Sequence, residues 1–441
     1  MKELLTRSAT ELGALLRRRE VSSEELTRLY CDRIAEHDAA LSSFVSVTAR
    51  AALRAARAID RRRDASLPFA GVPIAVKDLH LARGTFSRFG SRAFRYLWSP
   101  VDDTTVRAIR AAGFVILGKL ATSEMGVLPV TEPDIHPPTR NPWRTGLTSG
   151  GSSGGSGAAV AARLVPIAEG SDGGGSIRIP AAFCHLYGFK ASRGALPNPF
   201  ARVDPIGLAS VGPLTHTVED AAGFLDALKG RPLRKLVDNT ARLRVRFTTR
   251  GMLGPTEPAI AACVMTAARA LEALGHHVEE GAPVTGSVDE FLPLWERQAA
   301  NAPVLLESSL QPVTRWLRAR GKRHRKADMI PIHRKLERDV LDWFGDVDLW
   351  LTPTVGCFPP AVGAWRALDP EATFRAAAPL GQFTALFNLT GQPAASLPLG
   401  VSEDGLPVGV QLAARRGQDD LLLALSRQLE QALPWRNRRP P

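Results

Sequence analysis

The most informative stretch of this chain is residues 150–190, GGSSGGSGAAVAARLVPIAEGSDGGGSIRIPAAFCHLYGFK. The segment contains two runs rich in glycine and serine, 150–157 and 170–178, with an alanine-rich stretch between them. Glycine is favoured where the backbone takes a positive φ or closely approaches another group. Two such runs around several serines therefore predict backbone N–H groups directed at a bound atom, as in an oxyanion hole.

Helices and short strands are expected to alternate around these runs. Capping-box sequences begin at Ser8 and Ser22 and predict two N-terminal helices. The apolar, partly β-branched stretch 68–76 predicts a buried strand that ends at Lys77. Other expected elements are helices over 104–112, 157–164, 179–184 and 259–274, strands over 114–118 and 165–168, and a loop over 133–151. This alternation indicates an α/β fold in which both serine runs precede helices.

The composition predicts a globular protein without a nucleic-acid or membrane partner. The chain has 441 residues and a formal net charge of +12, with a dense basic run within 315–335. Apolar residues at helical spacing predict that this run is the solvated face of a helical region; they are Trp316, Leu317, Met329, Ile332 and Leu336. No apolar stretch reaches the roughly 18 residues of a membrane span, and no leader pattern is evident, so the cytoplasm is the expected compartment.

Neither the cysteines nor the histidines predict a metal site or a cofactor. The four cysteines are far apart and form no CxxC pair, which predicts reduced thiols. They are Cys31, Cys184, Cys263 and Cys357. No histidine spacing matches HExxH or another metal motif, so we expect no metal and no cofactor.

The segment 150–190 closely resembles the signature segment of the amidase signature family. Other segments fit the family in chain order; they are Lys77-Asp78, 139–143, 212–214, 387–393 and 405–409. The resemblance covers about 67–435 and implies a mixed β-sheet core sandwiched by helices. We expect one domain over 1–441. Its parts are N-terminal helices in 1–65, a catalytic core in 66–228, a variable region in 229–382 and a C-terminal core segment in 383–441.

The resemblance also implies a Ser-cisSer-Lys triad. Residue by residue, Ser176 corresponds to the nucleophile, Ser152 to the bridging serine and Lys77 to the base. The serines are 24 residues apart (176 − 152), in agreement with the family's spacing, and the family pattern implies a cis peptide between Gly151 and Ser152. A serine hydroxyl is a poor nucleophile until a neighbour takes its proton, and lysine can do so only when neutral. Lys77 is therefore expected to be buried.

The remaining site predictions concern the second run and the substrate. The expected oxyanion hole consists of the backbone amides of Gly173, Gly174, Gly175 and Ser176. Asp172 and Arg178 flank this turn and are expected to hold it rather than to contact substrate. The resemblance suggests substrate contacts from Met125 and Ser149, and from the variable region around Cys357 and Asn388.

Two alternatives compete with this triad. Residues 151–155 formally match GxSxG, which would make Ser153 the nucleophile, but the preceding 144–149 is a poor candidate for the required strand. Lys119 is a rival base, although the resemblance favours Lys77. Without the resemblance, each serine would more simply be a helix cap or a loop residue.

The resemblance implies an amidase that hydrolyses a linear or cyclic carboxylic amide to an acid and an amine or ammonia, through an acyl-enzyme on Ser176. The chain looks most like stand-alone amidases related to 6-aminohexanoate cyclic dimer hydrolase. The alternatives are a glutaminase subunit of a tRNA-dependent amidotransferase, an amide-forming acyltransferase, and a non-enzymatic binding protein on the same frame. The expected partner is a small-molecule amide, and a homodimer is one option for the assembly.

Overall fold

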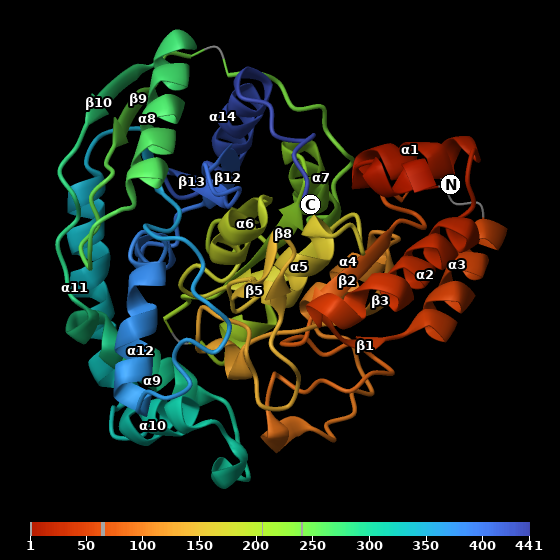
Figure 1. Ribbon diagram of the computed structural model, residues 1–441, viewed down its shortest axis with the longest axis horizontal. Coiled ribbons are helices and arrows are strands. Elements are labelled where there is room, and N and C mark those ends of the chain that lie inside the picture. Colours follow the sequence, from red (N-terminus) through yellow and green to blue (C-terminus); the bar gives the residue numbers. More distant parts are fainter. Residues whose placement is uncertain (1, 63–66, 205, 240) are drawn as a thin grey trace.

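A large mixed β-sheet runs through the protein. The computed structural model describes residues 2–62, 67–204, 206–239 and 241–441 (Figure 1). The sheet has 11 strands, in the spatial order β1 (Phe44–Val47), β3 (Val115–Leu120), β2 (Pro73–Lys77), β6 (Ala168–Asp172), β8 (Ser210–Thr215), β7 (Tyr187–Lys190), β12 (Ala394–Val401), β13 (Pro407–Ala414), β11 (Leu349–Pro353), β9 (Arg244–Phe247) and β10 (His277–Glu280). Strands β3, β2 and β6 are parallel, as are β11, β9 and β10, and the other neighbours are antiparallel.

Helices flank this sheet, which confirms the predicted fold class. They are α1 (Ala9–Arg18), α2 (Ser23–Leu41), α3 (Ala49–Arg62), α4 (Thr104–Ala111), α5 (Gly154–Ala161), α6 (Arg178–Cys184), α7 (Val218–Leu228), α8 (Pro258–Ala273), α9 (Val288–Asn301), α10 (Pro312–Gly321), α11 (Lys326–Phe344), α12 (Pro370–Ala377), α13 (Leu386–Leu389) and α14 (Asp419–Ala432). Helices α5 and α6 pack on each other and on the central strands, whereas α9, α10, α11 and α12 gather at one side of the molecule (Figure 1).

The predicted starts of the first two long helices and the predicted strand before Lys77 are confirmed. Complete capping boxes begin at Ser8 and Ser22, with Glu11 and Glu25 as the reciprocal acidic residues. Strand β2 is buried along its whole length and ends at Lys77. The local sequence was sufficient here because capping and an apolar run both act over a few residues.

Three features in the signature segment and the stretch before it differ from the prediction. Helix α5 begins at Gly154 rather than 157, and β6 spans Ala168–Asp172 rather than 165–168. The expected loop over 133–151 contains a two-stranded sheet of β4 (Arg140–Asn141) and β5 (Arg144–Thr148). The reason for the early helix start is close packing, because a Cβ at Gly155 would lie 2.4 Å from the Ala121 nitrogen.

The basic run lies on α10 and α11. Leu317 and Met329 are buried as predicted, and the other three apolar residues of the stripe are partly buried. Arg318 is an exception to the solvated face, because it is 2% exposed and its Nη2 lies 2.7 Å from Glu307 Oε1. Within the described residues, no helix combines the length and the apolar character that a bilayer crossing requires. The division of the chain into domains stays a prediction.

Candidate active site

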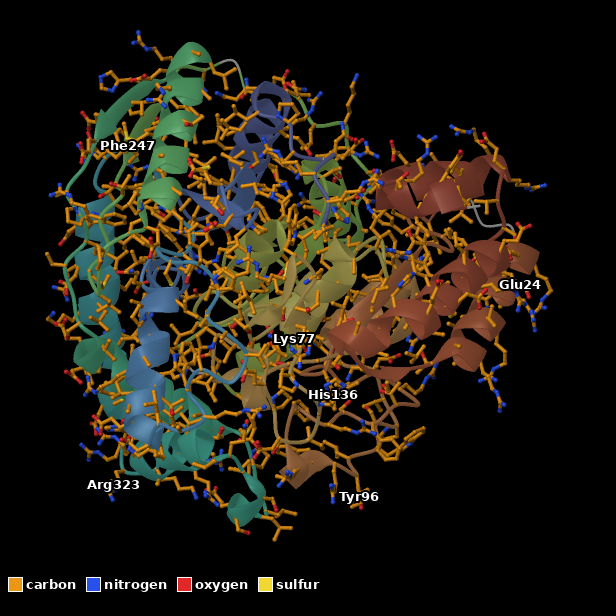
Figure 2. The ribbon with its side chains drawn as sticks, in the orientation of Figure 1. Glu24, Lys77, Tyr96, His136, Phe247 and Arg323 are labelled. Carbon is orange, nitrogen blue, oxygen red and sulfur yellow. The ribbon has the colours of Figure 1, made fainter. Side chains whose placement is uncertain are left out.

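Lys77 lies near the middle of the molecule (Figure 2), at the end of β2, with its side chain fully buried. Its Nζ donates to Ser152 Oγ at 2.7 Å, to Ser171 Oγ at 3.0 Å and to the Ser171 carbonyl at 3.2 Å. Burial lowers the pKa of this amine to about 7, although the charges of Glu169 and Asp172 act in the opposite direction. A large share of the amine is therefore uncharged at neutral pH.

The two serine turns meet beside this lysine. The peptide bond between Gly151 and Ser152 is cis, as expected. The Ser153 amide donates to the Ser176 carbonyl at 3.1 Å and so joins the first turn to the second. Ser176 is 8% exposed and lines a cavity of about 500 Å³. Of the three predicted triad residues, Ser176 therefore faces the space that a substrate could occupy.

A buried ion pair holds the second turn. Arg178 Nη2 lies 2.8 Å from Asp172 Oδ1, and its Nε lies 2.9 Å from Oδ2. Asn388 donates to the same carboxylate at 3.0 Å and accepts from Arg178 at 2.7 Å. Burial raises the pKa of Asp172, but the charge and hydrogen bonds of Arg178 outweigh this and hold that pKa well below its usual range. The pair thus fixes the turn, as predicted for Asp172 and Arg178.

The predicted oxyanion hole needs one correction. The Gly175 amide donates to Asp172 Oδ1 at 2.7 Å, so this N–H group is already occupied. The amides of Gly173, Gly174 and Ser176 have no hydrogen-bond acceptor among the described residues. Glycine is required at position 175 for the backbone conformation of the turn instead, since its φ is +129° and an added Cβ would lie 2.2 Å from Thr384 Oγ1.

The cavity next to Ser176 has mainly apolar walls. Its lining includes Ile179, Phe291, Trp295, Phe374 and Leu386, which come from helices α6, α9, α12 and α13. Its charged lining residues are Glu290, Lys335 and Asp339, which pair with one another through Lys335 Nζ at 3.4 and 2.8 Å. The site therefore offers an apolar compartment beside a buried polar cluster.

The predicted substrate contacts are not among the residues that line this cavity. Ser149 is buried, and its Oγ donates to the Thr139 carbonyl at 3.2 Å. Met125 packs in a neighbouring apolar cluster, although the adjoining Gly126 does line the cavity. Asn388 serves the ion pair described above, and Cys357 packs against another cluster. In this structure these side chains contact other parts of the protein, and a role for Met125 and Ser149 in substrate binding stays a prediction.

The two rival assignments also have other roles in the structure. Ser153 is fully buried, and its Oγ donates to the Ser171 carbonyl at 3.2 Å. The preceding strand β5 is largely exposed and belongs to the separate two-stranded sheet. Lys119 forms a buried ion pair with Asp78 at 2.7 Å. Neither residue combines an activated side chain with access to the cavity.

Sequence reasoning missed the residues that shape the cavity and the charges around Lys77. Trp295 lies beside the second turn, where a Cβ on Gly173 would come 3.4 Å from its ring. Glu169 accepts the backbone N–H of Lys77 at 3.0 Å, and His80 lies 2.8 Å from the other oxygen of Glu169. Trp295 is distant in sequence, and the only local signal for His80 was its position directly after Lys77-Asp78-Leu79.

Comparison with known proteins identifies the family. The model of the Amidase family matches residues 25–423. The chain belongs to the amidase family. A 6-aminohexanoate-cyclic-dimer hydrolase of Pseudomonas sp. (strain NK87) is 35% identical over 85% of this amidase and 86% of its own length.

Solved structures agree with this assignment. A 6-aminohexanoate cyclic dimer hydrolase in complex with substrate is 33% identical, with a TM-score of 0.90 over 99% of each chain. A bacterial aryl acylamidase is 26% identical, with a TM-score of 0.86 over 97% of this amidase and 96% of that chain. These matches favour amide hydrolysis over the glutaminase-subunit, acyltransferase and non-enzymatic alternatives.

Proposed function

We propose that this amidase hydrolyses a small, largely apolar carboxylic amide through an acyl-enzyme on Ser176, with Ser152 as the proton relay and Lys77 as the base. The observation that carries the proposal is the 2.7 Å hydrogen bond between Lys77 Nζ and Ser152 Oγ in a fully buried environment. A base must be unprotonated to act, and burial supplies that condition for a lysine.

The proposed reaction accounts for each proton that is transferred and each bond that forms or breaks. Ser176 Oγ attacks the amide carbon while its proton passes to Ser152, whose own proton passes to Lys77 Nζ. The C–N bond then breaks as the proton returns through Ser152 to the leaving nitrogen, and Ser176 remains as an ester. Water attacks this ester with the same groups acting in the same order, which releases the acid and restores the free hydroxyl.

The negative charge on the carbonyl oxygen requires donors in fixed positions. We assign this role to the amides of Gly173, Gly174 and Ser176, which have no other acceptor among the described residues. The loss of one such donor typically costs about 2.7 to 4 kcal/mol of transition-state stabilisation. The Asp172–Arg178 pair supports these amides from behind, because Gly175 is bonded to Asp172.

The cavity suggests the substrate class. Its walls near Ser176 are apolar, and its charged residues form ion pairs with one another. Such a space favours an uncharged acyl or amine group over an ionic one, since an unpaired charge buried there would lose its hydration. A linear or a cyclic aliphatic amide and an aryl amide all fit this description, in line with the substrates named for the two relatives.

The proposed nucleophile can be tested without knowledge of the natural substrate. We expect a fluorophosphonate probe to label the wild-type protein at Ser176, and the Ser176→Ala variant to remain unlabelled and to hydrolyse no member of a panel of aliphatic and aryl amides. Ser153→Ala is the matched control, because Ser153 is a neighbouring buried serine that does not line the cavity. Labelling that survives in Ser176→Ala and disappears in Ser153→Ala would contradict the assignment.

A further inference from the structure

A buried chain of charged groups lies directly behind Lys77. His80 is fully buried, with Nδ1 2.9 Å from Asp103 Oδ2 and Nε2 2.8 Å from Glu169 Oε1. Burial lowers the pKa of His80, but the charges of Glu169 and Asp103 outweigh this and raise that pKa to about 10. The ring is therefore an imidazolium between two carboxylates at neutral pH.

Glu169 connects this cluster to the proposed base. One of its oxygens lies against His80, and the other accepts the backbone N–H of Lys77 at 3.0 Å. Glu169 is also fully buried, so its charge acts on Lys77 through protein rather than through water. An unbalanced carboxylate in this position would favour a proton on the Lys77 amine, and the amine could then not act as a base.

The other charges near Lys77 have their own partners. Asp172, the second carboxylate whose charge acts on Lys77, pairs with Arg178 at 2.8 Å. Asp78 pairs with Lys119 at 2.7 Å, and Lys119 also donates to the His80 carbonyl at 2.6 Å. Within the described residues, His80 is thus the cation that contacts Glu169.

We propose that His80 is a positioning residue for amide hydrolysis: its charge balances Glu169, so that the carboxylate that anchors the Lys77 backbone does not hold a proton on the Lys77 amine. The 2.8 Å contact between His80 Nε2 and Glu169 Oε1 places the opposite charges of the two groups side by side. Asp103 caps α4 and fixes the ring from the opposite side. This inference rests on the proposed role of Lys77 as the base.

The test compares the pH dependence of fluorophosphonate labelling at Ser176 in three variants. In His80→Gln the charge of Glu169 is no longer balanced, and we expect the acid limb of the rate profile to move to higher pH by about 1 unit. In Glu169→Gln the side-chain amide can still accept the Lys77 N–H, but the negative charge is gone. We therefore expect the acid limb of the rate profile to move to lower pH. The double variant should return the limb close to its wild-type position.

The opposite directions of these shifts separate charge balance from a purely structural role. A rate that falls equally at every pH in both single variants, with an unmoved limb, would overturn the proposal. If circular dichroism shows that His80→Gln does not fold, Glu169→Gln serves as the test. An acid limb that does not move in Glu169→Gln would also overturn the proposal. Failure of the proposed function would look different: Lys77→Met would then be labelled at the wild-type rate.

Discussion

Strands β2 and β3 are neighbours in the sheet, and each carries a fully buried lysine with a different set of partners. Lys77 donates to the hydroxyls of Ser152 and Ser171 and to one carbonyl. Lys119 lies 2.7 Å from the Asp78 carboxylate and forms an ion pair with it. A carboxylate stabilises the charged amine, whereas neutral hydroxyls do so much less. The partners of a buried lysine therefore decide whether it holds the fold or accepts a proton.

A third buried lysine shows that a low pKa is not enough to make a base. Burial lowers the pKa of Lys190 to about 7, with a further lowering from the charge of Arg178. Its Nζ nevertheless donates only to the Ala191 carbonyl, at 3.1 Å, among the described residues. Among the residues that the structure describes, Lys190 Nζ donates to no serine hydroxyl. Lys77 differs because its amine contacts the hydroxyl of Ser152, and the amide of the following residue, Ser153, is bonded to the Ser176 carbonyl.

The largest expected effect separates Lys77 from the other buried lysines. We expect Lys77→Met to lower the rate of Ser176 labelling by about 10³-fold or more, since general-base catalysis typically contributes about 10²- to 10⁴-fold. Lys190→Met is the matched control and should keep most of the wild-type rate. The labelling rate of each folded variant, measured at pH 8, checks this. Equal losses in both variants would remove the distinction between the two lysines.

We expect the loss of Lys119 to lower the stability of the fold. In Lys119→Met the buried Asp78 carboxylate loses its partner, and we expect the free energy of unfolding to fall by about 3 to 5 kcal/mol. Denaturant unfolding followed by circular dichroism measures this change. The double variant Lys119→Met/Asp78→Asn removes both charges and should recover part of the loss. A single variant as stable as the wild type would mean that this ion pair does not support the fold.

The sequence was informative where local pattern and chemistry coincide. The buried strand that ends at Lys77 and the serine runs before α5 and α6 could be predicted, because each rests on a few consecutive residues. The resemblance then joined these segments into one site. The fold class followed from the alternation of helices and strands, while the boundary of α5 was wrong by three residues because its glycines serve close packing.

The rest of the site depends on contacts between distant residues. Trp295 reaches the second serine run from α9, more than a hundred residues along the chain. Gly175 looked like one more amide donor, yet its N–H group binds Asp172, a contact that only the folded turn defines. Glu169 lies on β6 and His80 in the turn that follows β2, so no local pattern in either segment predicts their pairing.

The smallest expected effect is the pH dependence of the wild-type enzyme. Burial lowers the pKa of Lys77 to about 7, and the reaction needs the neutral amine. The labelling rate should therefore be level above about pH 8 and fall roughly tenfold per unit well below pH 7, because the protonated fraction rises as the pH falls. A profile without an acid limb between pH 5 and 8 would contradict this. Because burial also brings the pKa of Lys190 to about 7, the limb alone does not identify the group. A limb that persists in Lys190→Met and moves in opposite directions in His80→Gln and Glu169→Gln would assign the proton to Lys77.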